Sequence, residues 1–453
     1  MSPRTPAVPG GNRIPGNRTL AVTTATALTA VGLSLMPDGG RDAAALDITG
    51  PCAIAAAEGF GEGPMSPDYI RPTGHRKATM IMVDFPDIPA TGNARERADF
   101  FAAYGDRYLD LASYGTYDLE LVPTPEWIRM PKPWTAYGVK RGISSATMQA
   151  YVQDAIDAAR ARGTDFGDSD FVYVVADENV PARPTVSQAN VFENLRAGDH
   201  RIRAAALVFG RGNDSATWQR GNFVHEANHL YGLPDLYNSR NGASVEYAGG
   251  WDTMSMAGIS DLIGWHKWKF GWLADEQVAC VPAGTSSHTL RPIGAPGANI
   301  AVVKTGPTSA VVAETRTRTG LDKDICTEGV LVYTVDSSVP TGRGPVRVVD
   351  SAPHSKGGTA CASRSPAELA ELGDAPFGVD ESHTFANGVR IGVTGREDDG
   401  SHRVRITKPA LTPDDPDATG TPDATASSDA PAAPVPGPGL HRGPGVYGVH
   451  RPH

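Results

Sequence analysis

Two histidines four residues apart, His225 and His229, are the residues of this sequence that point most clearly to chemistry. On a helix, this spacing places both imidazoles on one face, one turn apart, where they can bind the same metal ion. Glu226 follows the first histidine, so its carboxylate would lie beside the metal rather than bind it. The pattern H-E-x-x-H on a helix is typical of zinc hydrolases, in which two neutral imidazoles hold zinc and the carboxylate takes a proton from the attacking water.

The residues after His229 supply a candidate for the third ligand. Gly232 can adopt a positive φ angle and end the helix, and Pro234 keeps the following residues out of it. The chain can then turn back, so that Asp235 reaches the same ion. Zinc bound by two histidines and one aspartate keeps a position open for water, which is the arrangement of a catalytic site.

Other interpretations of this segment stay open. Glu246 could replace Asp235, because another type of zinc peptidase uses a downstream glutamate. Such a glutamate normally lies on a second helix, and residues 239–250 are too rich in Gly, Ser and Asn to form one. Tyr247 could donate a hydrogen bond to a developing oxyanion or simply pack in its loop. The two histidines could also be ordinary core residues, although the glycine stop at the expected spacing favours the metal site.

A segment rich in glycine, GGWDTMS at residues 249–255, follows the metal motif. Its methionine, Met254, could pack its thioether beneath the metal as an apolar floor. Met256 lies close behind, and we choose Met254 as the structural methionine of this turn.

The elements that must position these residues alternate between helical and strand patterns over residues 71–278. Apolar runs predict strands, and apolar residues spaced by three or four predict amphipathic helices. The predicted strands are 78–85, 117–122, 171–176 and 204–209, and the predicted helices are 94–111 and 145–162. This order predicts an α/β domain with a mixed sheet and an active-site helix.

Residues 279–408 have a different pattern. Short β-compatible runs recur there, separated by Gly, Pro, Asn and Asp, and the one helical segment expected is the short stretch 365–372. The runs are 299–304, 309–315, 329–335, 346–349, 389–393 and 402–406. The pattern predicts an all-β, sandwich-like domain.

The sequence HEANHLYGLPDLY, followed by GGWDTMS, resembles the immune-inhibitor-A-like metallopeptidases, a bacterial group of metzincins. That family has the motif H-E-x-x-H-x-x-G-x-x-D and then a Trp-x-x-Met-Ser turn. Residues 83–87, 113–115 and 263–273 resemble the family's opening strand, the link after its first helix and the helix behind the methionine turn. The position before the second histidine, often Gly in the family, is Asn228 here and points off the metal face.

The resemblance covers roughly residues 75–340 and implies a metzincin-like catalytic domain over residues 71–278. It implies a secreted endopeptidase that acts on protein or peptide substrates. Zinc would be the cofactor, held by His225, His229 and Asp235, with Glu226 as the general base and Met254 in the methionine turn. A calcium site is a further expectation from the family, without assigned ligands.

The two ends of the chain are expected to lie outside the folded domains. Residues 1–45 combine arginines, an apolar run at 20–36 and small residues at 43 and 45, which is typical of a signal peptide cleaved after Ala45. Residues 46–70 are then an N-terminal extension or a short pro-segment. Residues 409–453 are rich in Pro, Ala and Asp, which predicts a disordered tail. No second apolar run is long enough for a permanent membrane span, so we expect an extracellular protein.

The composition limits which binding partners we expect. The 453 residues carry a net charge of −10 without a long Lys/Arg run, so nucleic acid is not expected, and we expect a monomer. Exported chains pair their cysteines, and four cysteines allow three connectivities. We predict the pairs Cys52–Cys280 and Cys326–Cys361, with zinc ligation by Cys52 as a latency switch kept as an alternative.

We therefore keep three classes of function as hypotheses. The first is a zinc-dependent endopeptidase. The second is a cell-surface or protein-binding module with a vestigial metal site, and the third is a non-peptidase zinc hydrolase. Glu226 is intact, which speaks against a vestigial site, because a binding module has no need of a general base.

Overall fold

The computed structural model describes residues 48–56, 60–240, 242–258, 260–355, 357 and 372–410, which all belong to one compact unit. The predicted signal peptide, the tail from residue 411 onward and the predicted helical segment up to residue 371 lie outside these residues. None of the helices within the described ranges has the length and apolar character needed to span a bilayer.

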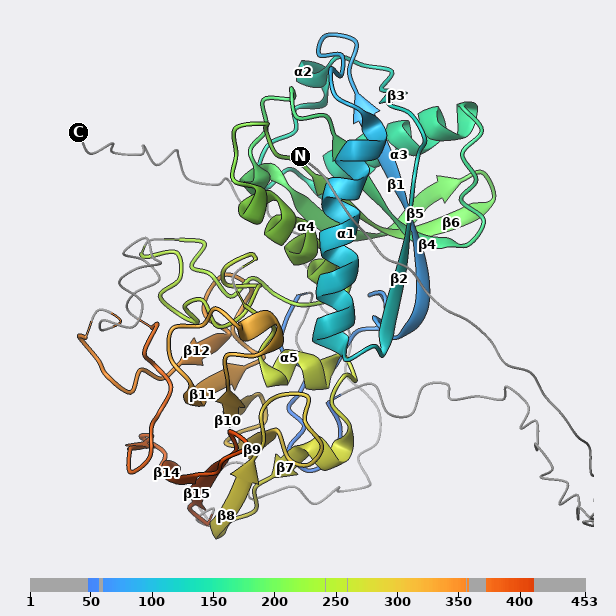
Figure 1. Cartoon of the computed structure of the whole chain (residues 1–453). Helices are drawn as coiled ribbons and strands as arrows, with labels where there is room; N and C mark the ends of the chain where they lie inside the picture. The colour runs from blue at the N-terminus through green and yellow to red at the C-terminus, as the bar shows by residue number, and fades with distance from the viewer. Residues whose placement is uncertain are drawn as a thin grey trace, which may run out of the picture. The chain divides into compact units, whose positions relative to one another are not determined.

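A six-stranded, mainly parallel sheet forms the first half of the described chain (Figure 1). Its strand order is β2-β1-β4-β6-β5, with β3 paired to β1, and β5 runs antiparallel to β6. The strands are β1 (Gly74–Asp84), β2 (Tyr117–Pro123), β3 (Ile128–Arg129), β4 (Ser169–Ala176), β5 (Gln188–Ala197) and β6 (His200–Val208). Because β1, β4 and β6 are covered on both faces, they consist of nearly continuous apolar runs.

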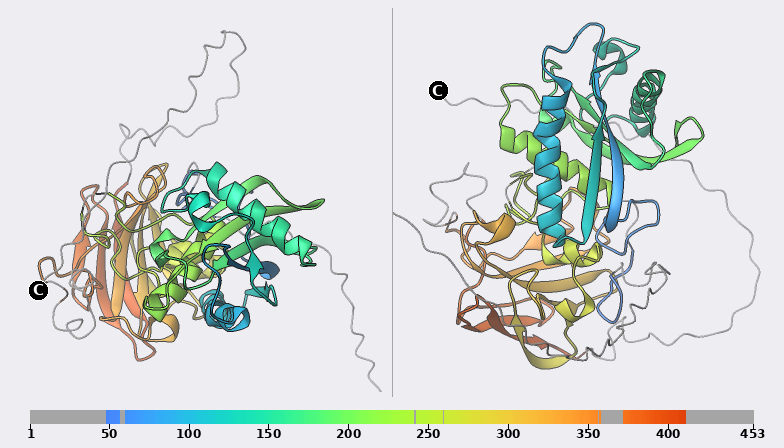
Figure 2. Two further views of the ribbon diagram at one scale, coloured as in Figure 1. Left: turned by 90° about the horizontal axis from the view of Figure 1, so that it is seen from above. Right: turned by 45° about the vertical axis from the view of Figure 1, so that its right-hand side comes forward.

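Helices cover this sheet on both faces because neighbouring residues of a strand point to opposite sides. Met80 and Met82 of β1 join the hydrophobic cluster of α1 (Ala94–Ser113) and α4 (Ala216–Leu230). The alternate residues of the strand, Ile81 and Val83, join the cluster of α3 (Ser145–Ala161) and the short α2 (Trp134–Tyr137). Figure 2 shows α1 and α3 on opposite sides of the sheet.

Two antiparallel sheets make up the second half. The five-stranded sheet has the order β12-β11-β10-β9-β7, in which only the β7–β9 pair is parallel, and the four-stranded sheet has the order β13-β14-β15-β8. One hydrophobic cluster contains side chains from both sheets, so they pack face to face as a sandwich. The strands are β7 (Val278–Cys280), β8 (Gly284–Leu290), β9 (Ile300–Lys304), β10 (Ser309–Arg316), β11 (Gly329–Asp336), β12 (Val346–Val348), β13 (Ser382–Thr384), β14 (Arg390–Arg396) and β15 (His402–Lys408).

The five-stranded sheet has a second buried face, which packs against the first half of the chain. Val311 and Ala313 of β10 point to the other β-sheet, whereas Ala310 and Val312 belong to the cluster that contains α1 and α4. Helix α5 (Gly264–Lys269) links the two halves directly: Glu314 on β10 accepts a hydrogen bond from the α5 backbone, and Lys267 donates to the carbonyl of Ala112 in α1.

The predicted order of an α/β part followed by a β-rich sandwich is confirmed at this coarse level. Each predicted strand and helix that falls within the described ranges has a counterpart, whereas α2, β3, β5, β7, β8 and β13 were not predicted. The sequences of β5 (QANVFENLRA) and β8 (GTSSHTL) are largely polar, because each lies at the edge of its sheet and is only partly buried.

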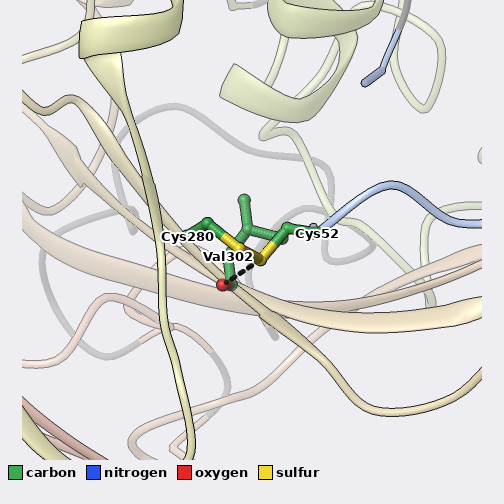
Figure 3. Close-up of a disulfide and its surroundings, with 3 residues drawn as sticks. All are labelled: Cys52, Cys280 and Val302. Atoms are coloured by element: carbon green, nitrogen blue, oxygen red, sulfur yellow. Dashed lines mark hydrogen bonds between the residues drawn. A yellow bond between two sulfur atoms is a disulfide. The ribbon is translucent and has the colours of Figure 1, made fainter. Parts of the chain in front are cut away.

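A disulfide ties the N-terminal segment to the β-rich half. Cys52 is bonded to Cys280 as predicted, and its sulfur lies 3.1 Å from the carbonyl oxygen of Val302 on β9 (Figure 3). The alternative of Cys52 as a zinc ligand is therefore wrong, because its sulfur is already bonded. Cys326 is also disulfide-bonded, and its predicted partner Cys361 lies outside the described residues.

Replacing Cys52 and Cys280 together by alanine should destabilise the protein, because the bond closes a loop of 228 residues in the unfolded chain. The loop-entropy contribution for such a loop is about 5 kcal/mol. Urea unfolding of the double variant and of the wild type measures the difference. Non-reducing peptide mapping confirms beforehand that the wild type carries the bond, and an unchanged free energy of unfolding would contradict the prediction.

Candidate metal centre

The end of helix α4 is built by backbone geometry that glycine makes possible. Gly232 has φ +88°, and its N–H and that of Leu233 bond back to the carbonyls of His229 and Asn228. This is a Schellman ending, which stops the helix at Leu230, directly after the second histidine. A Cβ on Gly232 would also lie 2.9 Å from the ring of Tyr69, so this position has no room for another residue.

Asp235 is then held in place by a loop from the β-rich half. The backbone N–H of Asp235 donates to Oγ1 of Thr341 at 2.8 Å, and its carbonyl accepts from the N–H of Gly342 at 2.9 Å. Both partners lie in the loop between β11 and β12. A segment far away in the sequence therefore fixes the bend that carries the third candidate ligand.

The three predicted ligands lie together. Nε2 of His225 and Nε2 of His229 are each 3.1 Å from Oδ1 of Asp235, and one ligand atom from each residue fits within 4.8 Å of the others. In a tetrahedral zinc site, two ligands at about 2.0–2.2 Å from the ion are about 3.3–3.5 Å apart. The group is thus compact enough to hold a metal ion of this size.

The hydrogen bonds of the other ring nitrogens, Nδ1 of each histidine, determine which kind of ion this group can bind. Nδ1 of His225 faces the carbonyl of Thr253 at 3.1 Å, and Nδ1 of His229 faces the carbonyl of Leu233 at 2.8 Å. Since a carbonyl only accepts, both Nδ1 atoms must carry the hydrogen, which leaves a lone pair on each Nε2 of the neutral rings. Two lone pairs and a carboxylate oxygen then converge on one point, and a cation is needed between them.

Protons on the imidazole nitrogens compete with a metal ion for the position between these acceptors. Burial opposes the charged form of His229, but the Asp235 carboxylate raises the pKa of this imidazole to about 9. Burial likewise opposes ionisation of Asp235, yet the charge of His229 and hydrogen bonds from both imidazoles hold its pKa well below the usual range. Metal binding must therefore displace a proton, so the donor set fits a divalent ion that competes well for imidazole nitrogen.

Glu226 lies beside this group without a strong partner. Its side chain is buried, its Oε1 is 3.4 Å from the amide nitrogen of Asn222, and its Oε2 has no hydrogen-bond partner within the described residues. Burial raises the pKa of Glu226, although the two neighbouring histidines act in the opposite direction. A buried carboxylate with a raised pKa is a stronger base than an exposed one, which suits a group that takes up and releases a proton.

The predicted methionine turn is built around the ligands by backbone contacts. The carbonyl of Thr253 faces His225, and the carbonyl of Met254 accepts from the N–H of Leu236, the residue after Asp235. The Met254 side chain is buried, and its place beneath the ion stays a prediction. Gly221 of α4 lies against this segment, where a Cβ would come within 2.5 Å of the backbone of residues 257–258.

Behind the turn, Asp252, His266 and Glu62 form a buried charged triad. Its carboxylate accepts from the backbone N–H groups of Met254 and Ile263 and lies 2.8 Å from Nδ1 of His266. The other ring nitrogen, Nε2, is 3.1 Å from Oε1 of Glu62 in the N-terminal segment. Burial opposes the charge on this ring, but the two carboxylates raise the pKa of His266 to about 10.

Glu246 and Tyr247, the alternative candidates from the sequence, lie outside the group of candidate metal ligands. Glu246 accepts a hydrogen bond from Asn238 at 2.7 Å and is not part of the group that could hold a metal. Tyr247 stacks beneath Arg347 in its loop, with 4.2 Å between the guanidinium carbon and the ring centroid. The tyrosine next to the ligands is instead Tyr237, whose ring is 6.0 Å from that of His225. Sequence reasoning missed it, although it lies only two residues after Asp235.

A cavity of about 450 Å³ opens beside His225 and Glu226. Its other lining residues come from the segment before α3, from the turn before β5, from the region of α4 and from the loops after the metal motif. They are Arg141, Thr185, Ser187, Ser215, Thr217, Trp218, Asn222, Tyr237, Ser244, Val245, Ser255, Met256 and Ala257. A molecule that enters the cavity therefore reaches one candidate metal ligand and the carboxylate of Glu226.

Comparison with known proteins adds no relative. No protein-family model matches the chain, and no curated protein matches it.

The His266 triad should make stability depend on pH. The pKa of His266 in the folded state, about 10, lies above the ordinary value of 6.5, so the contribution of the triad to stability is complete below about pH 6.5 and is lost as the pH rises towards 10. Glu62→Gln removes one carboxylate, so the decline should end at a lower pH. Urea unfolding between pH 6 and 10 tests this, with the exposed Glu193→Gln on β5 as the matched control. Identical pH profiles for all three proteins would refute the prediction.

Thr341→Val should weaken metal binding, because it removes the acceptor for the backbone N–H of Asp235. The loss of one such hydrogen bond corresponds to a fall in zinc affinity of about tenfold. Competition with a chromogenic chelator measures the affinity. Thr394→Val is the control, since Thr394 bonds to Arg403 within the four-stranded sheet. Equal affinities in both variants would show that the loop does not support the ligand.

Proposed function

We propose that this protein is a secreted zinc-dependent endopeptidase of the immune-inhibitor-A-like, metzincin type. The observation that carries the proposal is the convergence of three acceptor atoms, from His225, His229 and Asp235, next to the buried Glu226, whose Oε2 has no partner among the described residues. Two imidazoles and one carboxylate are a donor set that suits zinc and keeps a position for water. The mixed sheet, the glycine-terminated helix and the buried methionine turn support the same proposal.

Each residue then has a role in peptide hydrolysis. His225, His229 and Asp235 would hold the ion, with both imidazoles oriented by backbone carbonyls. When bound, zinc supplies a Lewis acid that lowers the pKa of water and polarises the scissile carbonyl. Glu226 takes the proton of the attacking water and delivers it to the leaving amine. Burial supports this role, because it raises the pKa of Glu226 above its usual value and so makes the carboxylate a stronger base.

Export from the cell belongs to the same proposal. The predicted signal peptide is its main support, and the Cys52–Cys280 disulfide agrees with it, because such bonds persist in oxidising compartments. Calcium stays an expectation from the family resemblance. Among the residues that the structure describes, His225, His229 and Asp235 are the only group of His, Cys, Asp or Glu side chains close enough together to hold a metal ion.

The test is metal content together with a peptide-library digest of the purified, secreted protein, with and without chelator. We expect one zinc per chain and peptide cleavage that stops on chelation and returns with zinc. Zinc with hydrolysis of small esters or amides alone would favour a non-peptidase hydrolase. Zinc without any hydrolysis would favour a binding module, and a protein that takes up no metal would overturn the proposal.

Glu226→Gln should separate binding of the metal from chemistry. The variant keeps the shape of the side chain and all three ligands, so zinc content should stay the same. Loss of the general base should lower kcat/KM by at least about 100-fold. Glu246→Gln is the matched control, because Glu246 is the rival ligand that bonds to Asn238. Unchanged proteolysis in Glu226→Gln would contradict the assigned role.

A further inference from the structure

The cavity beside the candidate metal site carries one fixed charge that the proposed reaction does not use. Apart from His225 and Glu226, Arg141 is the only ionisable side chain other than tyrosine among the residues that line it. Arg141 lies in the segment between α2 and α3, far in sequence from the candidate metal ligands. A guanidinium is charged at any physiological pH, so the cavity is permanently cationic at this point.

Tyr237 holds this guanidinium in place. Nη2 of Arg141 donates to the Tyr237 hydroxyl at 2.8 Å, and its guanidinium carbon is 5.3 Å from the centroid of the same ring. The Tyr237 ring is also 6.0 Å from that of His225. The arginine is thus positioned by a side chain that also borders the metal ligands.

Arg141 has no carboxylate partner of its own among the described residues. The structure contains many arginine–carboxylate pairs, such as Arg129 with Asp84 at 2.6 Å and Arg211 with Asp214 at 2.8 Å. Arg141 uses one of its N–H groups on Tyr237, and the remaining donors are available to a ligand. A guanidinium with free donors in a cavity is well suited to bind a carboxylate through two parallel hydrogen bonds.

We propose that Arg141 is a specificity-determining residue that binds a carboxylate of the peptide substrate close to the scissile bond. This inference rests on the proposed peptidase function and deepens it by naming the substrate class. The carboxylate could belong to a Glu or Asp side chain or to the C-terminus of the peptide, and both would bind the guanidinium in the same way. Tyr237 acts as a positioning residue for Arg141.

Binding is measured first, because it does not depend on cleavage. The probes are acetylated and amidated heptapeptides of Ala, Leu and Gly with one Glu at successive positions, each with its Gln counterpart. The zinc-loaded Glu226→Gln variant is titrated with them, and fluorescence of Trp218, which lines the cavity, reports binding. We expect at least one Glu peptide to bind about tenfold more tightly than its Gln counterpart.

Variants then assign the preference. With Arg141→Gln added, the Glu peptide and its Gln counterpart should bind with about the same dissociation constant. Arg141→Glu should reverse the preference, so that a peptide with Lys at the same position binds more tightly than the Glu peptide. Tyr237→Phe should reduce the preference partly, because it removes the hydrogen bond and keeps the ring. Arg107→Gln, an exposed arginine on α1, controls for net charge and should keep the preference. The Gln peptides with a free C-terminus show whether a terminal carboxylate is bound instead.

The outcomes separate the two proposals. Equal binding of every Glu, Gln and free-carboxylate peptide, or a preference that survives Arg141→Gln, would overturn the role of Arg141. A preference that depends on Arg141, in a protein whose wild type cleaves no peptide, would support the carboxylate site and refute the peptidase. Cleavage by the wild type should show the same ratio in kcat/KM between matched Glu and Gln substrates.

Discussion

The site depends on one electrostatic constraint, which is that three hydrogen-bond acceptors face one another at about contact distance. Nε2 of His225, Nε2 of His229 and Oδ1 of Asp235 lie within hydrogen-bond range while both Nδ1 atoms are committed to carbonyls. Such an arrangement is unfavourable unless a cation lies between the acceptors. The backbone that fixes the Nδ1 atoms therefore fixes the chemistry of the site as well.

The support for these ligands comes from parts of the chain that are distant in sequence. The carbonyl of Thr253 orients His225, and the loop that contains Thr341 and Gly342 binds both backbone groups of Asp235. Behind them, the N-terminal segment contributes Glu62 to the buried triad with His266 and Asp252. The β-rich half and the N-terminal segment are thus structural parts of the site.

The sequence predicts the metal ligands because their geometry is local. One helical turn between the histidines, a glycine stop and a short bend are all encoded within eleven residues, and the apolar strands follow from composition alone. Thr341, Tyr237 and Arg141 could not be found in the same way, because their roles arise from contacts across the fold. Tyr247 was considered in place of Tyr237, since position near the motif does not show which side chain turns towards the cavity.

The buried carboxylates of this protein differ in how their charge is compensated. Asp252 accepts two backbone N–H groups and pairs with His266, and Glu314 accepts from Arg316, Tyr333 and the backbone of α5. Glu226 is equally buried, yet it has one long contact and an oxygen without a partner among the described residues. An uncompensated buried carboxylate destabilises the fold, so such exceptions concentrate where function requires them. Glu62 and Asp374 also have one oxygen without a partner among the described residues, but Glu62 pairs with His266. The proposed function therefore assigns the role of proton acceptor to Glu226, which lies beside the candidate metal ligands.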